Sequence, residues 1–211
     1  MKGLKIKICG MREPENIRNI SGLLPDYMGF IFYPESRRFA GGLSPEIRAE
    51  IPVFSKKVGV FVNENTEKLI ETCSTYGIGT VQLHGDESPE YCEELAENGL
   101  RILKVFGIGD SMDSSAMKPF QETCNYFLFD TATDRFGGSG NKFDWGLLEE
   151  YTLEIPFFLS GGILPDDAKM ILKLEHPMLF GIDINSRFEI SPGIKDVELC
   201  ESFINGIRVP G

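Results

Sequence analysis

Short hydrophobic runs recur along the chain about every 20 to 30 residues, and each is short enough to be a β-strand. Many of them are apolar almost throughout instead of alternating with polar residues. Such runs are typical of strands in a parallel sheet that is covered on both faces. The runs are LKIKIC (4–9), YMGFIF (27–32), KVGVFV (57–62), TVQL (80–83), RILKVF (101–106), YFLF (126–129), PFFLS (156–160) and MLFGID (178–183).

The segments between these runs carry signals for helices. Ser44-Pro45-Glu46, Ser88-Pro89-Glu90 and Leu164-Pro165-Asp166 each place a proline near a first turn with an acid after it. Residues 65–72 and 144–150 have apolar side chains at helical spacing. Eight strands that alternate with helices in about 200 residues predict an α/β fold, a single (β/α)8 TIM barrel over residues 1–211.

An open, doubly wound sheet is the alternative fold for the same alternation. It more often has a glycine-rich fingerprint after the first strand, and the segment CGMREP does not match GxGxxG. No linker, repeat or low-complexity tract suggests a second domain.

Composition narrows the functional classes. The net charge is −11, which disfavours nucleic acid and anionic membranes as partners but allows a small anionic substrate held locally. Five dispersed cysteines without a CxxC pair, and no apolar segment of signal-peptide length at the start, predict reduced thiols in the cytoplasm. His84 and His176 are the two histidines and neither has a partner at metal-site spacing, so no metal site is expected.

The ends of the predicted strands supply the candidate chemistry, because active sites of (β/α)8 barrels lie at the C-terminal ends of the strands. A thiol, carboxyl groups, an arginine, a histidine and glycine turns then meet at one rim. The candidates are Cys9, Arg38, His84, Asp130, Gly161, Gly162, Asp183, Asn185 and Ser186.

Several of these residues also have a purely structural interpretation. Cys9 is either a buried hydrophobe or a reactive thiol, and Asp130 either caps the next segment or is a carboxyl whose pKa is raised by its apolar surroundings. The glycines at 161 and 162 either form a tight turn or present N–H groups to a phosphate. His84 is either a hydrogen-bonding residue of the scaffold or part of the site, whereas His176 precedes a strand and is expected at the opposite rim.

The segment DRFGGSGNKFDW (134–145) has three glycines within four residues. It is interpreted either as an irregular surface loop or as a lid that closes over the substrate.

Seven stretches of the sequence, in order, resemble the phosphoribosylanthranilate isomerase family of tryptophan biosynthesis. A single one of these motifs would be weak evidence, but together they span nearly the whole chain. They are KICGM (7–11), GFIFYPESRRF (29–39), VGVFVNE (58–64), VQLHGDE (81–87), FDTATDRFGGSGNKFDW (129–145), LSGGI (159–163) and GIDINS (181–186).

The resemblance implies an Amadori rearrangement of N-(5-phosphoribosyl)anthranilate to 1-(2-carboxyphenylamino)-1-deoxyribulose 5-phosphate, by general acid/base catalysis without metal or cofactor. It implies that Cys9 and Asp130 are catalytic and that Arg38 binds the anthranilate carboxylate. Phosphate is expected at the turns 161–162 and 185–186. Asp183 matches a family acid at the end of the last strand and is assigned to substrate binding. His84, also carried by a matching motif, is assigned to substrate binding.

The chain departs from the family pattern at two positions: Arg12 stands where threonine is common, and Arg187 where glycine is usual. Three other functions remain as alternatives. An indole-glycerol-phosphate synthase would need a catalytic lysine and an N-terminal extension, and a histidine-pathway isomerase would show aspartates in both halves. A non-catalytic sugar-phosphate-binding module would need neither Cys9 nor Asp130. The chain is expected to be a monomer or homodimer.

Overall fold

The computed structural model describes residues 3–132 and 142–208, and these residues form a closed barrel of eight parallel strands in sequence order. The last strand pairs with the first, so that Lys7 lies opposite Asp183 in the register. This confirms the predicted (β/α)8 TIM barrel. The strands are β1 (Lys5–Ile8), β2 (Tyr27–Ile31), β3 (Lys56–Phe61), β4 (Thr80–Leu83), β5 (Arg101–Ile108), β6 (Tyr126–Thr131), β7 (Phe157–Leu159) and β8 (Leu179–Ile184).

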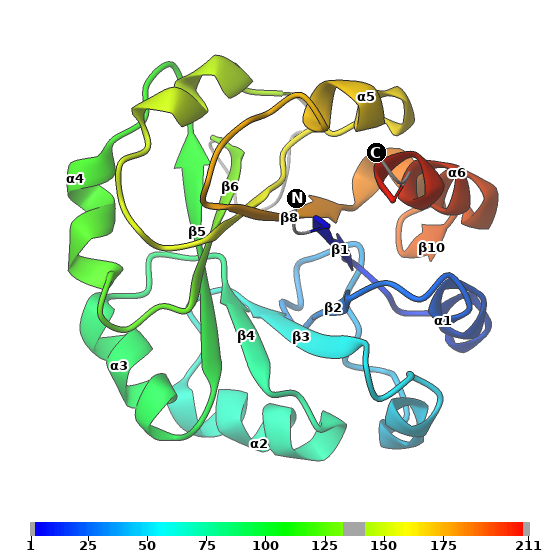
Figure 1. Ribbon diagram of the computed structural model, residues 1–211. Coiled ribbons are helices and arrows are strands. Elements are labelled where there is room, and N and C mark those ends of the chain that lie inside the picture. The colour runs from blue at the N-terminus through cyan, green and yellow to red at the C-terminus, as the bar shows by residue number, and fades with distance from the viewer. Residues whose placement is uncertain (1–2, 133–141, 209–211) are drawn as a thin grey trace.

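Helices surround the barrel on the outside, as Figure 1 shows. Helix α2 illustrates how the sequence sets the ends: the Asn65 side chain accepts hydrogen bonds from the first-turn amides, and Gly77 ends the helix in a left-handed conformation. The α-helices are α1 (Pro14–Ser21), α2 (Thr66–Tyr76), α3 (Pro89–Glu97), α4 (Ser114–Met117), α5 (Ala168–Ile171) and α6 (Val197–Ile207). Short 3-10 helices are η1 (Pro45–Ala49), η2 (Lys118–Phe120), η3 (Trp145–Glu150), η4 (Pro165–Asp167) and η5 (Ser186–Phe188).

Two connections are shorter than the helical spacing in the sequence suggests. Between β2 and β3 the chain forms only η1, because Pro52 disfavours the helical conformation of Ile51 and cannot donate to a helical hydrogen bond. Residues 144–150, which were expected to form a helix, make the 3-10 helix η3, with Asp144 as its cap. The barrel therefore closes with several one- or two-turn crossovers instead of eight full α-helices.

The hydrophobic core has an inner and an outer part. Side chains that point into the barrel, including Tyr27, Leu128 and Phe158, fill its lower half, with the rings of Tyr27 and Phe158 in edge contact at 5.3 Å. Above them lies a smaller cluster of Cys9, Ile31 and Val60. The other faces of the strands pack against the surrounding helices. The thiol of Cys9 thus lies at the top of the inner core, where the barrel opens.

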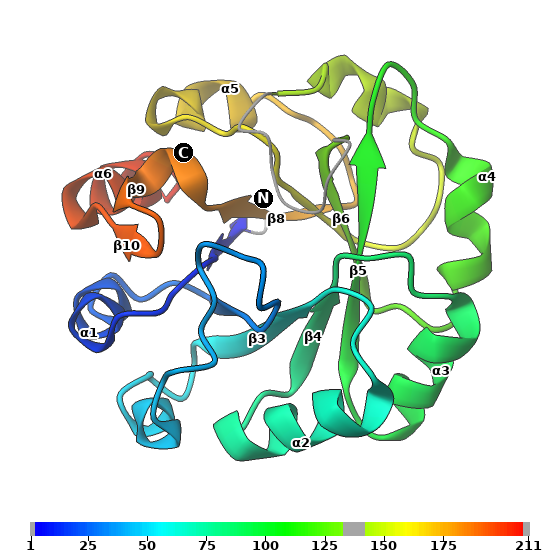
Figure 2. The same cartoon turned by 180° about the vertical axis from the view of Figure 1, so that it is seen from behind.

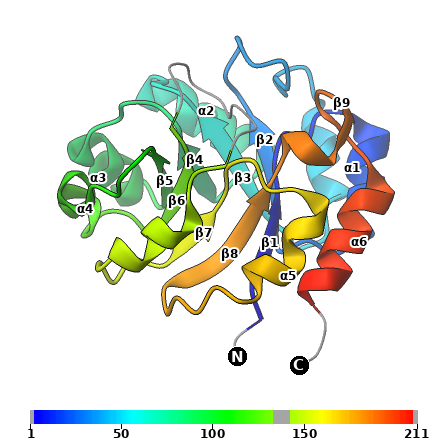
Figure 3. The same ribbon diagram turned by 90° about the horizontal axis from the view of Figure 1, so that it is seen from above.

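The connections after the strands gather at one end of the barrel. Figure 3 shows the connection between β2 and η1 at this end together with β9 (Glu189–Ser191), opposite the start of β1 and the end of α6. After β8 the chain forms an antiparallel hairpin of β9 (Glu189–Ser191) and β10 (Ile194–Lys195). From behind, Figure 2 shows this hairpin next to α1 and α6.

Residues 133–141, which carry the glycine-rich part of the predicted lid or surface loop, lie outside the described residues. Among the helices that are described, none is both long and apolar enough to cross a membrane.

Candidate active site

Strand β1 brings an ion pair and a thiol to the barrel axis. Lys7 is fully buried, and its Nζ donates to Oδ1 of Asp183 at 2.9 Å. Cys9 follows the end of the strand, donates its backbone N–H to the carbonyl of Ile184 and is 3% exposed. Alternate residues of a strand share a face, so Lys7 and Cys9 both point inward. Asp183, predicted to bind substrate, is engaged by Lys7 below the rim.

A glycine on the neighbouring strand makes room for the thiol. A Cβ added to Gly29 of β2 would lie 2.7 Å from Sγ of Cys9. Any other residue at this position would therefore push the sulfur out of its place.

The protonation of Cys9 depends on its burial and on two charged neighbours. Burial is the largest influence and raises the pKa of the thiol, while the charge of Lys7 works in the opposite direction. Asp183 offsets part of the Lys7 effect because its own charge disfavours a second anion. Desolvation outweighs the nearby ammonium group, so Cys9 is a neutral thiol before substrate binds.

Asp130 of β6 has the protonation behaviour expected from its apolar approach. It is 7% exposed, and burial raises the pKa of its carboxyl to about 6. The amide of Thr131 donates to Oδ1 at 2.8 Å and works in the opposite direction. This carboxyl is therefore able to hold a proton much closer to neutral pH than an exposed aspartate.

His84 follows β4 and faces Asp130. Its Nε2 lies 3.8 Å from Oδ2 of Asp130, while the side-chain amide of Gln82 donates to its Nδ1. Burial and the charges of Lys7 and Lys104 lower the pKa of the imidazole to about 4. His84 is therefore a neutral group beside Asp130.

The turn after β7 packs closely against Asp130. Gly161 and Gly162 both have positive φ angles, of 84° and 61°, which favour glycine. A Cβ on Gly161 would lie 2.6 Å from Oγ1 of Thr131 and 3.1 Å from Oδ1 of Asp130. Within residues 3–132 and 142–208, the amide of Gly162 has no hydrogen-bond acceptor. This amide therefore fits the predicted anion-binding role.

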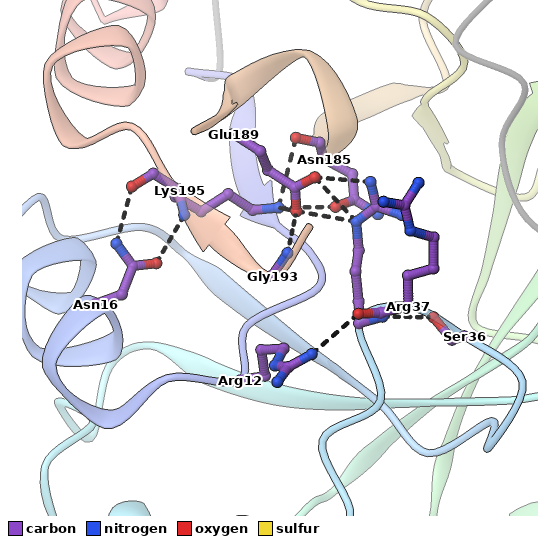
Figure 4. Close-up of polar contacts among 9 residues, drawn as sticks. Arg12, Asn16, Ser36, Arg37, Asn185, Glu189, Gly193 and Lys195 are labelled. Carbon is purple, nitrogen blue, oxygen red and sulfur yellow. Dashed lines mark hydrogen bonds and ion pairs between the residues drawn. The ribbon is translucent and has the colours of Figure 1, made fainter. Parts of the chain in front are cut away.

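Arg38 and Asn185 come together on the β1 side of the rim. A Cβ on Gly10 would lie 2.7 Å both from Cδ of Arg38 and from Oδ1 of Asn185, so the two side chains meet directly above the residue after Cys9. Arg38 donates to the carboxylate of Glu189. Lys195 donates to the side chain of Asn185 (Figure 4). Ser186 is exposed at the start of η5.

The two departures from the family pattern have different surroundings. Arg12 packs on Gly193 and donates to the backbone carbonyl of Arg37 at 3.0 Å, so it ties the segment after β1 to the segment after β2. Arg187 is exposed.

His176 lies away from the rim and has structural contacts. Its ring nitrogens meet the carbonyl of Tyr151 at 3.2 Å and the amide of Met178 at 3.1 Å. It also borders an outer cavity of about 640 Å³ that Trp145 and Met170 line. This cavity contains none of the candidate site residues, so we place the active site at the strand ends.

In the described part of the chain, no group of three His, Cys, Asp or Glu residues is arranged to hold a metal.

Four charged residues at or near the site were not singled out from the sequence. The sequence could have revealed Lys7, because a lysine two positions before Cys9 in a buried strand lies on the same face of the strand as Cys9. Glu87 had no such signal: it is buried and accepts from the amides of Asn63 and Gly85 and from Lys104, which fixes the segment that carries His84. Glu189 and Lys195 belong to the hairpin after β8, which the sequence pattern did not predict.

The closed parallel barrel and the groups at its C-terminal rim place the chain among the (β/α)8-barrel enzymes. The comparisons with known proteins make the assignment specific. Residues 6–206 match the model of the N-(5'-phosphoribosyl)anthranilate (PRA) isomerase family, and the chain belongs to this family. It is thus an isomerase of N-(5'-phosphoribosyl)anthranilate in tryptophan biosynthesis, as the resemblance of the motifs implies.

Individual relatives agree over the full length of the domain. The Parabacteroides distasonis N-(5'-phosphoribosyl)anthranilate isomerase is 45% identical over 207 residues, which cover 97% of this chain and 94% of the relative. The crystal structure of the Thermotoga maritima isomerase has a TM-score of 0.83 at 34% identity, with 97% and 98% of the chains covered. Another solved isomerase is in complex with reduced 1-(o-carboxyphenylamino)-1-deoxyribulose 5-phosphate, with a TM-score of 0.78, 31% identity and the same coverage.

Proposed function

We propose that this chain performs the Amadori rearrangement by general acid/base catalysis, with Asp130 as the acid and Cys9 as the base. The observation that carries the proposal is the raised pKa of Asp130, about 6, at the rim of the barrel that also carries a buried thiol. A carboxyl whose pKa lies this close to neutral pH still carries its proton in a useful fraction of the molecules, so it is a competent proton donor.

In the first step Asp130 donates its proton to the ring oxygen of the ribose as the C1′–O bond breaks. The nitrogen lone pair forms a C=N bond to C1′, and the open-chain substrate becomes an iminium cation. The carboxylate left on Asp130 and the new cation then lie in the same buried site, where their attraction is strong.

In the second step Cys9 removes a proton from C2′, and the electrons of the C–H bond neutralise the iminium to give an enamine. Cys9 must be a thiolate for this step, although its pKa is raised before substrate binds. The cationic intermediate supplies the favourable charge, together with Lys7, whose ammonium group already interacts with the thiol. The enol at C2′ then tautomerises to the ketone of the product.

The remaining candidates hold the ends of the substrate. Arg38 binds the anthranilate carboxylate, since its planar guanidinium matches that group. The turns at 161–162 and 185–186 bind phosphate through backbone amides and the side chains of Asn185 and Ser186. His84 positions substrate beside Asp130. Asp183 lies below the rim and acts on the site through its ion pair with Lys7.

The substrate is a small sugar phosphate, and the reaction is proposed to need no cofactor, metal, nucleic acid or membrane. All five cysteines are free thiols, which fits a cytoplasmic location. Residues 1–211 are proposed to act as one catalytic domain. One solved structure shows monomers generated from the dimeric Thermotoga maritima isomerase, and both the monomer and the homodimer remain predictions for this chain.

The test is turnover of phosphoribosylanthranilate generated in situ, followed by the change in anthranilate fluorescence. The unmodified protein should consume many equivalents of substrate. Cys9→Ala and Asp130→Asn should each lower kcat by about 10²-fold or more, as expected for loss of a general acid or base. Their affinity for the reduced product analogue should change little. Stoichiometric quenching without turnover would instead indicate a binding module, and a Cys9→Ala variant of nearly full activity would remove Cys9 from the mechanism.

A further inference from the structure

The hairpin after β8 places a buried carboxylate against the arginine assigned to the substrate carboxylate. Nε of Arg38 donates to Oε1 of Glu189 at 2.9 Å, and Nη2 donates to Oε2 at 2.7 Å. The side chain of Glu189 is only 4% exposed, whereas that of Arg38 is 22% exposed. The contact uses one edge of the guanidinium group and leaves Nη1 and part of Nη2 for another acceptor.

Glu189 is itself held from the other side. Nζ of Lys195 donates to its Oε1 at 2.6 Å, and the amide of Gly193 donates to the same oxygen at 3.0 Å. Figure 4 shows the Glu189 carboxylate next to Lys195 and Gly193. Burial opposes ionisation of Glu189, but the hydrogen bonds from Arg38 and Lys195 lower its pKa, so it stays charged.

Lys195 is fixed in turn. Its side chain is fully buried, and its Nζ also donates to Oδ1 of Asn185 at 2.7 Å. The backbone N–H and C=O of Lys195 are both bound by the side chain of Asn16 on α1. The carboxylate that holds Arg38 is therefore connected to the scaffold through α1 and β10.

We propose that Glu189 is a positioning residue that fixes the Arg38 guanidinium so that its free edge meets the carboxylate of the substrate. Lys195 balances the charge of Glu189, so the group of three side chains keeps one net positive charge for an incoming carboxylate. This inference rests on the role proposed for Arg38, and it makes the β9–β10 hairpin the element that selects a carboxylate-bearing aromatic substrate.

The charges predict opposite results for positioning and for competition. If Glu189 only competed with substrate for Arg38, its neutralisation would strengthen binding of a carboxylate. If Glu189 positions Arg38, neutralisation lets the guanidinium group rotate away, and carboxylate binding weakens.

The experiment compares two ligands by titration calorimetry: reduced 1-(o-carboxyphenylamino)-1-deoxyribulose 5-phosphate and its counterpart with a plain phenyl group. Selection for the carboxylate is measured as the Kd of the phenyl ligand divided by the Kd of the carboxylate ligand. Glu189→Gln should lower this ratio about tenfold, while the Kd of the phenyl ligand stays within twofold. Lys195→Met should lower the ratio as well and serves if Glu189→Gln does not fold. Glu50→Gln breaks a matched Arg18–Glu50 pair on the surface and should leave the ratio unchanged.

The Arg38→Ala variant distinguishes failure of the carboxylate-binding role of Arg38 from failure of the positioning role of Glu189. It should remove the selection, and Glu189→Gln added to it should have no further effect. If Arg38→Ala leaves the ratio unchanged, the proposed role of Arg38 fails and the inference falls with it. If Arg38→Ala removes the selection but Glu189→Gln preserves or increases it, or weakens both ligands equally, only the positioning role is overturned.

Discussion

At the scale of single residues, the site contains a carboxyl and a thiol whose protonation is reversed from what their roles require. Burial raises the pKa of Asp130 to about 6 and also raises that of Cys9 above its ordinary value. Between these two pKa values the main form of the enzyme has a carboxylate and a thiol. The active form, with the proton on Asp130 and a thiolate at Cys9, is a minor tautomer of it.

The fraction of this tautomer does not depend on pH between the two pKa values, because the two forms hold the same number of protons. We therefore expect kcat/KM to be flat from about pH 6 to at least pH 8.5. Below pH 6 it should fall tenfold per pH unit, because Asp130 and Cys9 are then both protonated. Initial rates between pH 4.5 and 8.5 check this. A tenfold fall per unit above pH 6 would show instead that only the proton on Asp130 matters in the first irreversible step.

The raised pKa of Asp130 also has a consequence for stability. An acid with a raised pKa in the folded state contributes stability at low pH, and that contribution is lost as pH rises through about 6. At pH 7.5 an ionised Asp130 should cost about 2–3 kcal/mol relative to a neutral group.

Asp130→Asn should therefore raise the Tm by roughly 5–10 °C at pH 7.5, and by much less at pH 4.5, although it should lower kcat. Thermal denaturation at the two pH values measures the difference. Asp110→Asn, at an exposed position, is the control and should change the Tm little at either pH. Equal stabilisation by Asp130→Asn at both pH values would contradict a charge-dependent cost.

At the scale of elements, β2 controls the position of the thiol on β1. Gly29→Ala would bring a methyl group to within 2.7 Å of Sγ of Cys9. We expect a loss of about 1–3 kcal/mol in the free energy of unfolding and a fall in kcat of at least tenfold. Gly59→Ala on β3 is the matched control, because its methyl group would meet the ring of Phe61 instead. It should destabilise similarly in urea unfolding but leave kcat nearly unchanged; a similar loss of kcat in both variants would argue against a specific effect on Cys9.

Strand positions and the rim were predictable from the sequence, because a buried parallel strand is a short apolar run and its end is marked by a change to polar residues. Cys9 and Asp130 were found in this way. The hairpin of β9 and β10 could not be predicted, because its two short strands have no apolar periodicity. A glutamate such as Glu189 is ordinarily expected at the surface. The same holds for Glu87, whose partners from other segments are the amide of Asn63 and the ammonium group of Lys104. Local patterns predict which residues form a strand, whereas charge pairing between distant segments depends on how the barrel closes.

At the scale of the whole molecule, the barrel closes at the pairing of β1 with β8, where Lys7 and Asp183 form a buried ion pair. Their side chains are 0% and 5% exposed, so either charge left alone would be poorly solvated. We expect Asp183→Asn and Lys7→Met each to lower the free energy of unfolding by about 3–5 kcal/mol.

The double variant Lys7→Met/Asp183→Asn removes both charges, and its loss should be smaller than the sum of the two single losses by at least about 2 kcal/mol. Urea unfolding of the four proteins gives the coupling energy. The exposed pair Lys68 and Glu64, one turn apart, provides the control cycle, with an expected coupling below about 1 kcal/mol. Additive losses at Lys7 and Asp183 would mean that each is stabilised by other contacts and that their pairing does not hold the first and last strands together. With strong coupling, the charges that close the barrel are the same ones that lie beneath the thiol, so a change that improves closure also changes the protonation of Cys9.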